Sequence, residues 1–171
     1  QAVRLDPLSS ATLVITGALY RVRGRYQRAL DYVENTLQID PENGFAKWLE
    51  AVVYRDTGQL DKAMDVASTI RENPAWGFTY GLVLARLGRD EEARRELEKL
   101  EGPPPHVLAL VFLNAQFGEN DEAFRWLKVM SDQMPHPWYP WLLGWLPDLE
   151  TVYDDPRVRE MAEEIGLGDF R

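Results

Sequence analysis

The sequence predicts an all-α protein, a solenoid in which pairs of helices stack on one another. Hydrophobic residues make up 45% of the 171 positions and charged residues 27%, which is the composition of a folded chain. A six-residue frame, glycine followed five positions later by alanine, recurs four times at intervals of 34, 30 and 30 residues. Apolar residues around each frame follow helical spacing. Because one such helix pair cannot bury its own apolar face, repeated pairs are expected to share a continuous core.

The repeated frame occupies residues 24–29, 58–63, 88–93 and 118–123. We expect its glycine to end the first helix of each pair, because the turn requires a left-handed residue. The alanine, together with a small or β-branched residue seven positions before the glycine, lets the two helices approach closely. Those earlier residues are Gly17, Ala51, Gly81 and Val111. Acidic residues near the start of three second helices, Asp61, Asp90 and Asp121, favour the helix dipole.

Prolines divide the chain into predicted units. Pro41, Pro74, the prolines at 103–105 and Pro135 stop the second helices. The predicted helix pairs therefore cover about residues 8–40, 42–73, 75–102 and 104–134. Residues 5–7 (Leu-Asp-Pro) match residues 39–41 (Ile-Asp-Pro), so we expect residues 1–7 to be a linker or the end of a preceding repeat in a longer protein.

The segment 135–171 is predicted to cap the last repeat. It is rich in tryptophan and proline, and the prolines preclude a long regular helix there. A short helix is expected over about residues 138–146, with Trp138, Trp141 and Trp145 on one side. Asp155 and Pro156 open a last amphipathic helix that Gly166 closes.

The pattern small–x2–Tyr–x3–Gly–x4–Ala, seen at Gly17, Tyr20, Gly24 and Ala29, resembles the tetratricopeptide repeat. The resemblance covers about residues 5–133 and implies a right-handed α-solenoid of about four helix-turn-helix units. In that family the first helices line a concave groove that binds peptides or helices. The third and fourth units depart from the pattern because they have 30 residues, and the fourth lacks the aromatic and the small residue of its first helix.

The end of the chain resembles the region that follows tetratricopeptide repeats in bacterial signalling proteins. The matching features are Leu146, Leu149, the Asp-Pro-Arg at 155–157 and the Ile-Gly-Leu at 165–167. Such regions follow winged-helix, adenylate-cyclase or kinase domains. The resemblance therefore implies the cytoplasmic regulatory part of a larger signalling protein that a further domain could tether to a membrane, and it does not identify the attached domain.

Nothing in the sequence predicts catalysis, a cofactor or a metal site. There is no cysteine, and the two histidines, His106 and His136, lack a third ligand. The acidic runs at 90–92 and 121–122 are interpreted as helix starts. A net charge of −9 argues against nucleic acid as a partner, and no apolar run is long enough to span a membrane.

The inward face of the first helices is the predicted protein-binding groove. Its residues are Val14, Arg21, Phe45, Trp48, Val52, Arg55, Phe78, Leu82, Arg86, Leu108 and Phe112. The floor is apolar, and the three arginines are expected near one height, where guanidinium groups can pair with carboxylates. The expected partner is a protein or peptide with apolar anchors and some acidic residues. The groove does not resemble the chaperone-binding carboxylate clamp, because these positions hold no lysine or asparagine.

Four other interpretations remain open. The apolar strip can be a homodimer face, so that the chain is an oligomerisation module that brings attached catalytic or DNA-binding domains together. The chain's own tryptophan-rich tail or last helix can also fill the groove. Individual arginines can be solvated or paired with a neighbouring helix. An enzyme remains an alternative only if the fold forms an acidic cleft that the sequence does not reveal.

Overall fold

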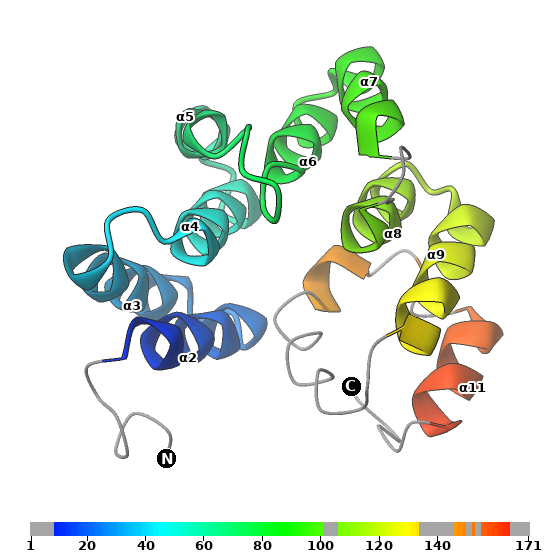
Figure 1. The fold of residues 1–171 in the computed structure, drawn as a ribbon, viewed down its shortest axis with the longest axis horizontal. Helices are drawn as coiled ribbons and strands as arrows, with labels where there is room; N and C mark the ends of the chain where they lie inside the picture. Colours follow the sequence, from blue (N-terminus) through cyan, green and yellow to red (C-terminus); the bar gives the residue numbers. More distant parts are fainter. Residues whose placement is uncertain (1–8, 101–105, 134–145, 150–151, 153–154, 165–171) are drawn as a thin grey trace. The chain divides into compact units, whose positions relative to one another are not determined.

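The structure, a computed structural model, describes residues 9–100, 106–133, 146–149, 152 and 155–164. The helices in chain order are α2 (Ser10–Val22), α3 (Tyr26–Ile39), α4 (Gly44–Asp56), α5 (Leu60–Thr69), α6 (Thr79–Arg86), α7 (Asp90–Leu100), α8 (Val107–Gln116), α9 (Asn120–Gln133), the 3-10 helix η2 (Leu146–Leu149) and α11 (Pro156–Glu164). Every regular element within the described ranges is helical, which confirms the all-α prediction (Figure 1). The chain divides into two compact units, residues 1–96 and 97–171. No described helix is both long enough and apolar enough to cross a membrane.

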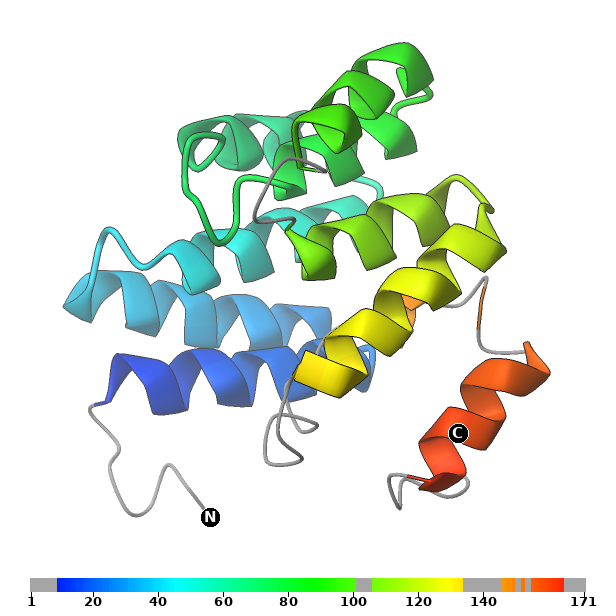
Figure 2. The same ribbon diagram turned by 45° about the vertical axis from the view of Figure 1, so that its right-hand side comes forward.

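Within the first unit, successive helix pairs stack on one another. α2 packs against α3 and α4 packs against α5, and α4 also contacts α2 on one side and α6 on the other. Helices α2, α4 and α6 therefore form one row, while α3 and α5 lie in a second row against α4 (Figures 1 and 2). Every helix of the first row thus presents one face away from the second row.

The glycine turns have the backbone conformation that the sequence predicts. At Gly58 the φ angle is +76°, in the left-handed region, and the other three frame glycines lie between +66° and +73°. The Gln59 N–H donates to the Tyr54 carbonyl at 2.8 Å, and the Gly58 N–H donates to the Arg55 carbonyl at 3.1 Å. The first of these is the long-range bond of a Schellman cap, and equivalent bonds close the other three turns.

Short polar side chains start two of the first-row helices, α2 and α4. The Ser9 hydroxyl accepts a hydrogen bond from the Thr12 N–H at 3.4 Å at the start of α2, and the Asn43 side-chain oxygen accepts one from the Ala46 N–H at 2.9 Å at the start of α4. Each satisfies a backbone donor that the first helical turn leaves without a partner. Ser9 is therefore the N-cap residue of α2, and Asn43 is that of α4.

Small residues are buried where the helices cross. The four frame alanines are at most 1% exposed. A Cβ atom placed on Gly17 of α2 would lie 3.1 Å from the Tyr32 Cβ of α3 and 3.0 Å from a Leu49 methyl carbon of α4. Contacts this short leave little room for a side chain at Gly17. The recurrence of small residues in the sequence therefore reflects a close crossing of helices.

The second unit is built around the apolar helix α8. Helix α9 packs against α8, and η2 also contacts it. The last helix begins at Pro156, as predicted, and buries Val158. Arg157 joins this helix to α9, since its guanidinium group lies 2.8 Å from an Asp121 carboxylate oxygen and 4.6 Å from the centre of the Phe124 ring. Most of the short helix predicted over residues 138–146, and the predicted end of the last helix at Gly166, fall outside the described residues.

Candidate functional site

Four aromatic residues of the first unit form an aromatic cluster: Phe45, Trp48, Trp76 and Phe78. Phe45 and Trp48 are three residues apart on α4 and so lie on the same face of this helix, with ring centres 5.3 Å apart. Trp76 comes from the loop before α6 and stacks on Phe45, with ring centres 4.8 Å apart and planes 2° from parallel. Trp76 also lies 5.4 Å from Trp48 and 6.4 Å from Phe78.

The loop before α6 is shaped to present Trp76. The side-chain oxygen of Asn73 accepts hydrogen bonds from the N–H groups of Ala75 and Trp76, at 2.9 and 3.0 Å. Gly77 follows, where a Cβ atom would clash with the Arg71 carbonyl oxygen, so no other residue fits without a shift of the backbone. These local constraints fix the tryptophan against α4.

The aromatic cluster has a buried base and a half-exposed edge. Trp48 is 0% exposed, and Phe78 is also buried. Phe45 and Trp76, the stacked pair, are half-buried. Stacked aromatic pairs contribute about 0.5–1.5 kcal/mol beyond the burial of their area. The edge is therefore a rigid apolar surface that solvent reaches.

Beside the aromatic cluster, Asp56 binds two arginines. The Arg21 Nε of α2 lies 2.8 Å from Asp56 Oδ2, and Arg55 Nη2 lies 2.8 Å from Asp56 Oδ1. The Arg21, Arg55 and Asp56 side chains are 0%, 6% and 13% exposed. Arg21 also lies over Trp48, 5.7 Å from its ring centre. The Oδ2 atom of Asp56 therefore ties α4 to α2 through Arg21, while Oδ1 holds Arg55 of the same helix, in a largely desolvated setting where charge pairs are stronger than in water.

The structure places the predicted groove residues in three classes. Eight are buried: Val14, Arg21, Trp48, Val52, Arg55, Phe78, Leu82 and Phe112. Phe45 and Leu108 are half-buried, and Arg86, in the last turn of α6, is exposed. Atoms of the chain itself therefore cover most of these side chains. Leu108 and Phe112 belong to the second unit, and the other nine belong to the first.

The helical pattern gives no signal for Trp76, and it places Asp56 on the inward face of α4 without identifying its partner. Trp76 precedes α6 in a loop, so no periodicity points to it, although its tryptophan type and the preceding asparagine mark a structured turn. Asp56 lies 35 residues after Arg21, about one repeat. This spacing places the two at one height on neighbouring helices, and it is the signal that could have identified the pair.

The histidine within the described residues has a structural role. His106 precedes α8, and its Nδ1 accepts a hydrogen bond from the Ala109 N–H at 3.3 Å, as an N-cap does. His136 lies outside the described residues. Among the residues that the structure describes, no group of three or more His, Asp or Glu side chains is arranged to hold a metal ion.

Comparison with known proteins supports the repeat assignment. Residues 23–75 match the tetratricopeptide repeat family. The chain is 31% identical over 111 residues to a TPR repeat-containing protein of Methanocaldococcus jannaschii, an alignment that covers 63% of this chain and 35% of that protein. It is 26% identical over 84 residues to Superkiller protein 3 of Saccharomyces cerevisiae, covering 48% of this chain and 6% of that protein. The chain thus spans about a third or less of these relatives, and no solved structure matches it. The tetratricopeptide resemblance is confirmed.

Proposed function

We propose that this tetratricopeptide-repeat chain is a non-catalytic scaffold that binds a protein partner through the row formed by α2, α4 and α6. Tetratricopeptide repeats generally mediate interactions between proteins. The proposal rests on the half-exposed Phe45–Trp76 stack, which forms the edge of the aromatic cluster above its buried base. Large, rigid aromatic side chains dominate the energetics of protein interfaces because they bury much area with little loss of entropy.

Charge selects the partner in this proposal. Arg86 is exposed on α6, whereas Arg21 and Arg55 share the Asp56 carboxylate. An acidic group of the partner therefore meets Arg86 first, and apolar anchors of the partner pack on the aromatic edge. A partner that reaches Trp48 must displace atoms of this chain, because that side chain is fully buried.

We further propose that the chain is the cytoplasmic regulatory part of a larger bacterial signalling protein. The support for this context is the Asp-Pro-Arg segment at 155–157, together with Leu146 and Leu149, which resembles the region that follows such repeats in bacterial signalling proteins. The alternative is a homo-oligomerisation module that brings attached catalytic or DNA-binding domains together. It uses the same apolar edge, because self-association buries the same kind of surface.

Quantitative affinity capture tests the proposed face. The tagged chain is compared with the double variant Phe45→Ser/Trp76→Ser and with the control Ile39→Ser, which removes an apolar side chain that is 50% exposed on α3. We expect the unmodified chain and the control to capture at least one protein that the double variant does not capture. Equal capture by all three would contradict the proposal. A sedimentation-detected dimer that only the double variant dissociates would favour the oligomerisation alternative.

A further inference from the structure

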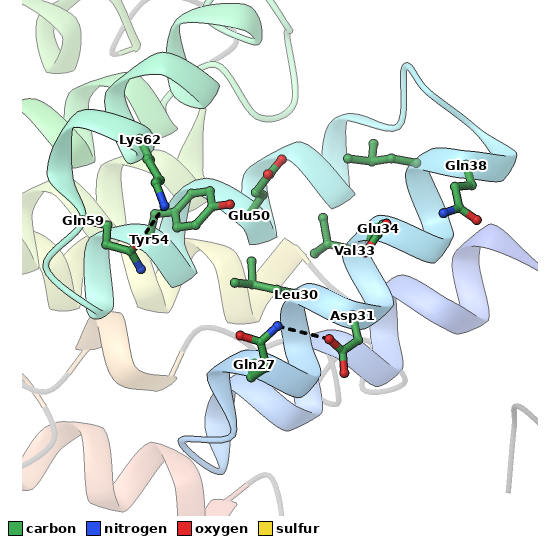
Figure 3. Close-up of a pocket in the computed structure, with 11 residues that line it drawn as sticks. Gln27, Leu30, Asp31, Val33, Glu34, Gln38, Glu50, Tyr54, Gln59 and Lys62 are labelled. Atoms are coloured by element: carbon green, nitrogen blue, oxygen red, sulfur yellow. Dashed lines mark hydrogen bonds between the residues drawn. The ribbon is translucent and has the colours of Figure 1, made fainter.

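We propose a second binding surface: the groove between α3 and α5 accepts a partner segment that carries a lysine or arginine between apolar residues. This surface lies in the second row of helices and does not include the aromatic cluster. The groove holds about 660 Å³ and is lined by residues of α3, α4 and α5 together with Gln59 (Figure 3). That volume is within the range of ligand pockets in proteins and is enough for several side chains.

The groove exists because α3 and α5 both pack against α4, which forms the floor between them. Leu30, Val33 and Leu37 recur on one face of α3 at helical spacing and supply the apolar part of the lining. Glu50 and Tyr54, four residues apart on α4, form the polar part of the floor. All of these residues belong to the first unit, so the surface is complete within it.

Carboxylates dominate the charge of the groove. Asp31, Glu34 and Glu50 line it, whereas Lys62 supplies the ammonium group. Lys62 donates a hydrogen bond to Gln59 Oε1 at 2.8 Å and lies over the Tyr54 ring, 5.3 Å from its centre. Figure 3 shows this ammonium group beside Tyr54 and Gln59, with Asp31 and Glu34 across the groove on α3. The lining is therefore negative, and its charge complements a basic side chain.

Glu50 provides a site for such a cation. It is half-buried, and desolvation raises the pKa of its carboxyl group, although the hydrogen bond with Tyr54 and the charge of Lys47 oppose this effect. A cation brought into the groove would favour the ionised carboxylate and so gain binding energy from a group that is already partly desolvated. Apolar neighbours of that cation would meet the leucines of α3.

The lining disfavours other ligands. Phosphates, and hence nucleic acids, are repelled by the carboxylates. Among the described residues, the carboxylates are not grouped closely enough to hold a metal ion. An acidic segment of the kind proposed for the aromatic edge would be repelled here. The two surfaces therefore select partners of opposite charge.

Fluorescence anisotropy with labelled synthetic peptides tests the proposal on the whole chain. One peptide is an amphipathic helix of leucine, alanine and lysine, and its counterpart has glutamate at every lysine position. We expect the lysine peptide to bind and the glutamate peptide not to bind. The double variant Glu34→Gln/Glu50→Gln should weaken binding about tenfold or more, the effect of losing one charge-assisted contact. The control Glu72→Gln/Glu91→Gln also removes two carboxylate charges, at exposed positions outside the groove, and should leave binding within about twofold.

Further measurements separate this surface from the aromatic edge and from self-association. Phe45→Ser/Trp76→Ser should leave the lysine peptide bound, so failure of the proposed function would not affect this result. Loss of binding in that variant, equal binding of both peptides, or equal weakening by Glu72→Gln/Glu91→Gln would overturn the proposal. A dimer detected by sedimentation and dissociated by Glu50→Gln would assign the groove to a second copy of the chain and would also overturn it. Circular dichroism is used to check that each variant is folded.

Discussion

Replacing Gly58 with alanine will destabilise the turn between α4 and α5 through backbone conformation alone. The φ angle at Gly58 is +76°, and a Cβ atom placed there would have no neighbouring atom within 4 Å. Steric crowding therefore contributes nothing, and the change in stability isolates the left-handed conformation. An L-residue other than glycine costs roughly 1–2 kcal/mol in that conformation. Asparagine enters it more readily than alanine and should cost less.

Urea unfolding followed by circular dichroism measures this effect. We expect Gly58→Ala to lower the free energy of unfolding by roughly 1–2 kcal/mol, with an unchanged dependence on urea concentration, because the surface exposed on unfolding stays the same. Gly58→Asn should lie between the alanine variant and the unmodified chain. A change close to zero for alanine, or an asparagine variant no more stable than the alanine variant, would refute the reasoning.

Three further predictions concern packing and charge. Gly17→Ala should lower the free energy of unfolding by about 1 kcal/mol in the same assay. The alanine Cβ would lie 3.1 Å from the Tyr32 Cβ, and this crowding outweighs the gain in helix propensity. A more stable variant would contradict the close crossing of α2 and α3. Burial raises the pKa of Glu50, so the contribution of this carboxyl group to stability is greatest below its unfolded pKa of 4.5 and falls as pH rises through the raised folded pKa. Glu50→Gln should therefore be at least as stable as the unmodified chain at pH 7. A large loss of stability in urea unfolding would contradict this prediction. Hydrogen bonds from Arg157 lower the pKa of Asp155 to about 2, so the stabilising effect of the Asp155 carboxylate is present above pH 3.8 and is lost as pH falls toward 2. NMR titration of Asp155 should give that low pKa, and Arg157→Gln should return the pKa toward 3.8. An unchanged pKa in the variant would exclude the Arg157 side chain as the cause.

The helices and their turns were predictable because their determinants are local. The glycine at each turn indicates a left-handed backbone conformation, and the alanine five positions later marks a position that is buried in the helix packing. Both signals recur once per repeat, so even the degenerate fourth unit is recognisable. The contact of Phe45 with Trp48 follows from their separation of three residues on one helix.

The site was less predictable because its contacts join residues that are distant in sequence. Helical spacing shows which face of α4 is apolar, but not whether solvent or the chain itself covers that face. Trp76 reaches Phe45 from a loop, where no periodic pattern applies. The pairing of Arg21 with Asp56 depends on the register between α2 and α4, which only the packed structure fixes.

The groove between α3 and α5 was missed for a similar physical reason. Asp31 and Glu34 are charged residues on an amphipathic helix, and from sequence alone they belong to a solvated face. They become part of a concave surface only because α5 packs against α4 on the other side of Glu50 and Tyr54. A charge pattern therefore predicts which residues face outward, but not whether that outward surface is recessed.

Site-specific photo-crosslinking from Phe45 tests the central claim, that the row of α2, α4 and α6 holds another polypeptide. A photoreactive phenylalanine derivative is placed at position 45 and, as the control, at Ser68, an exposed position of α5. The account predicts an adduct with a different protein from position 45 and none from position 68. Equal adducts from both positions, or adducts only with a second copy of the chain, would contradict it.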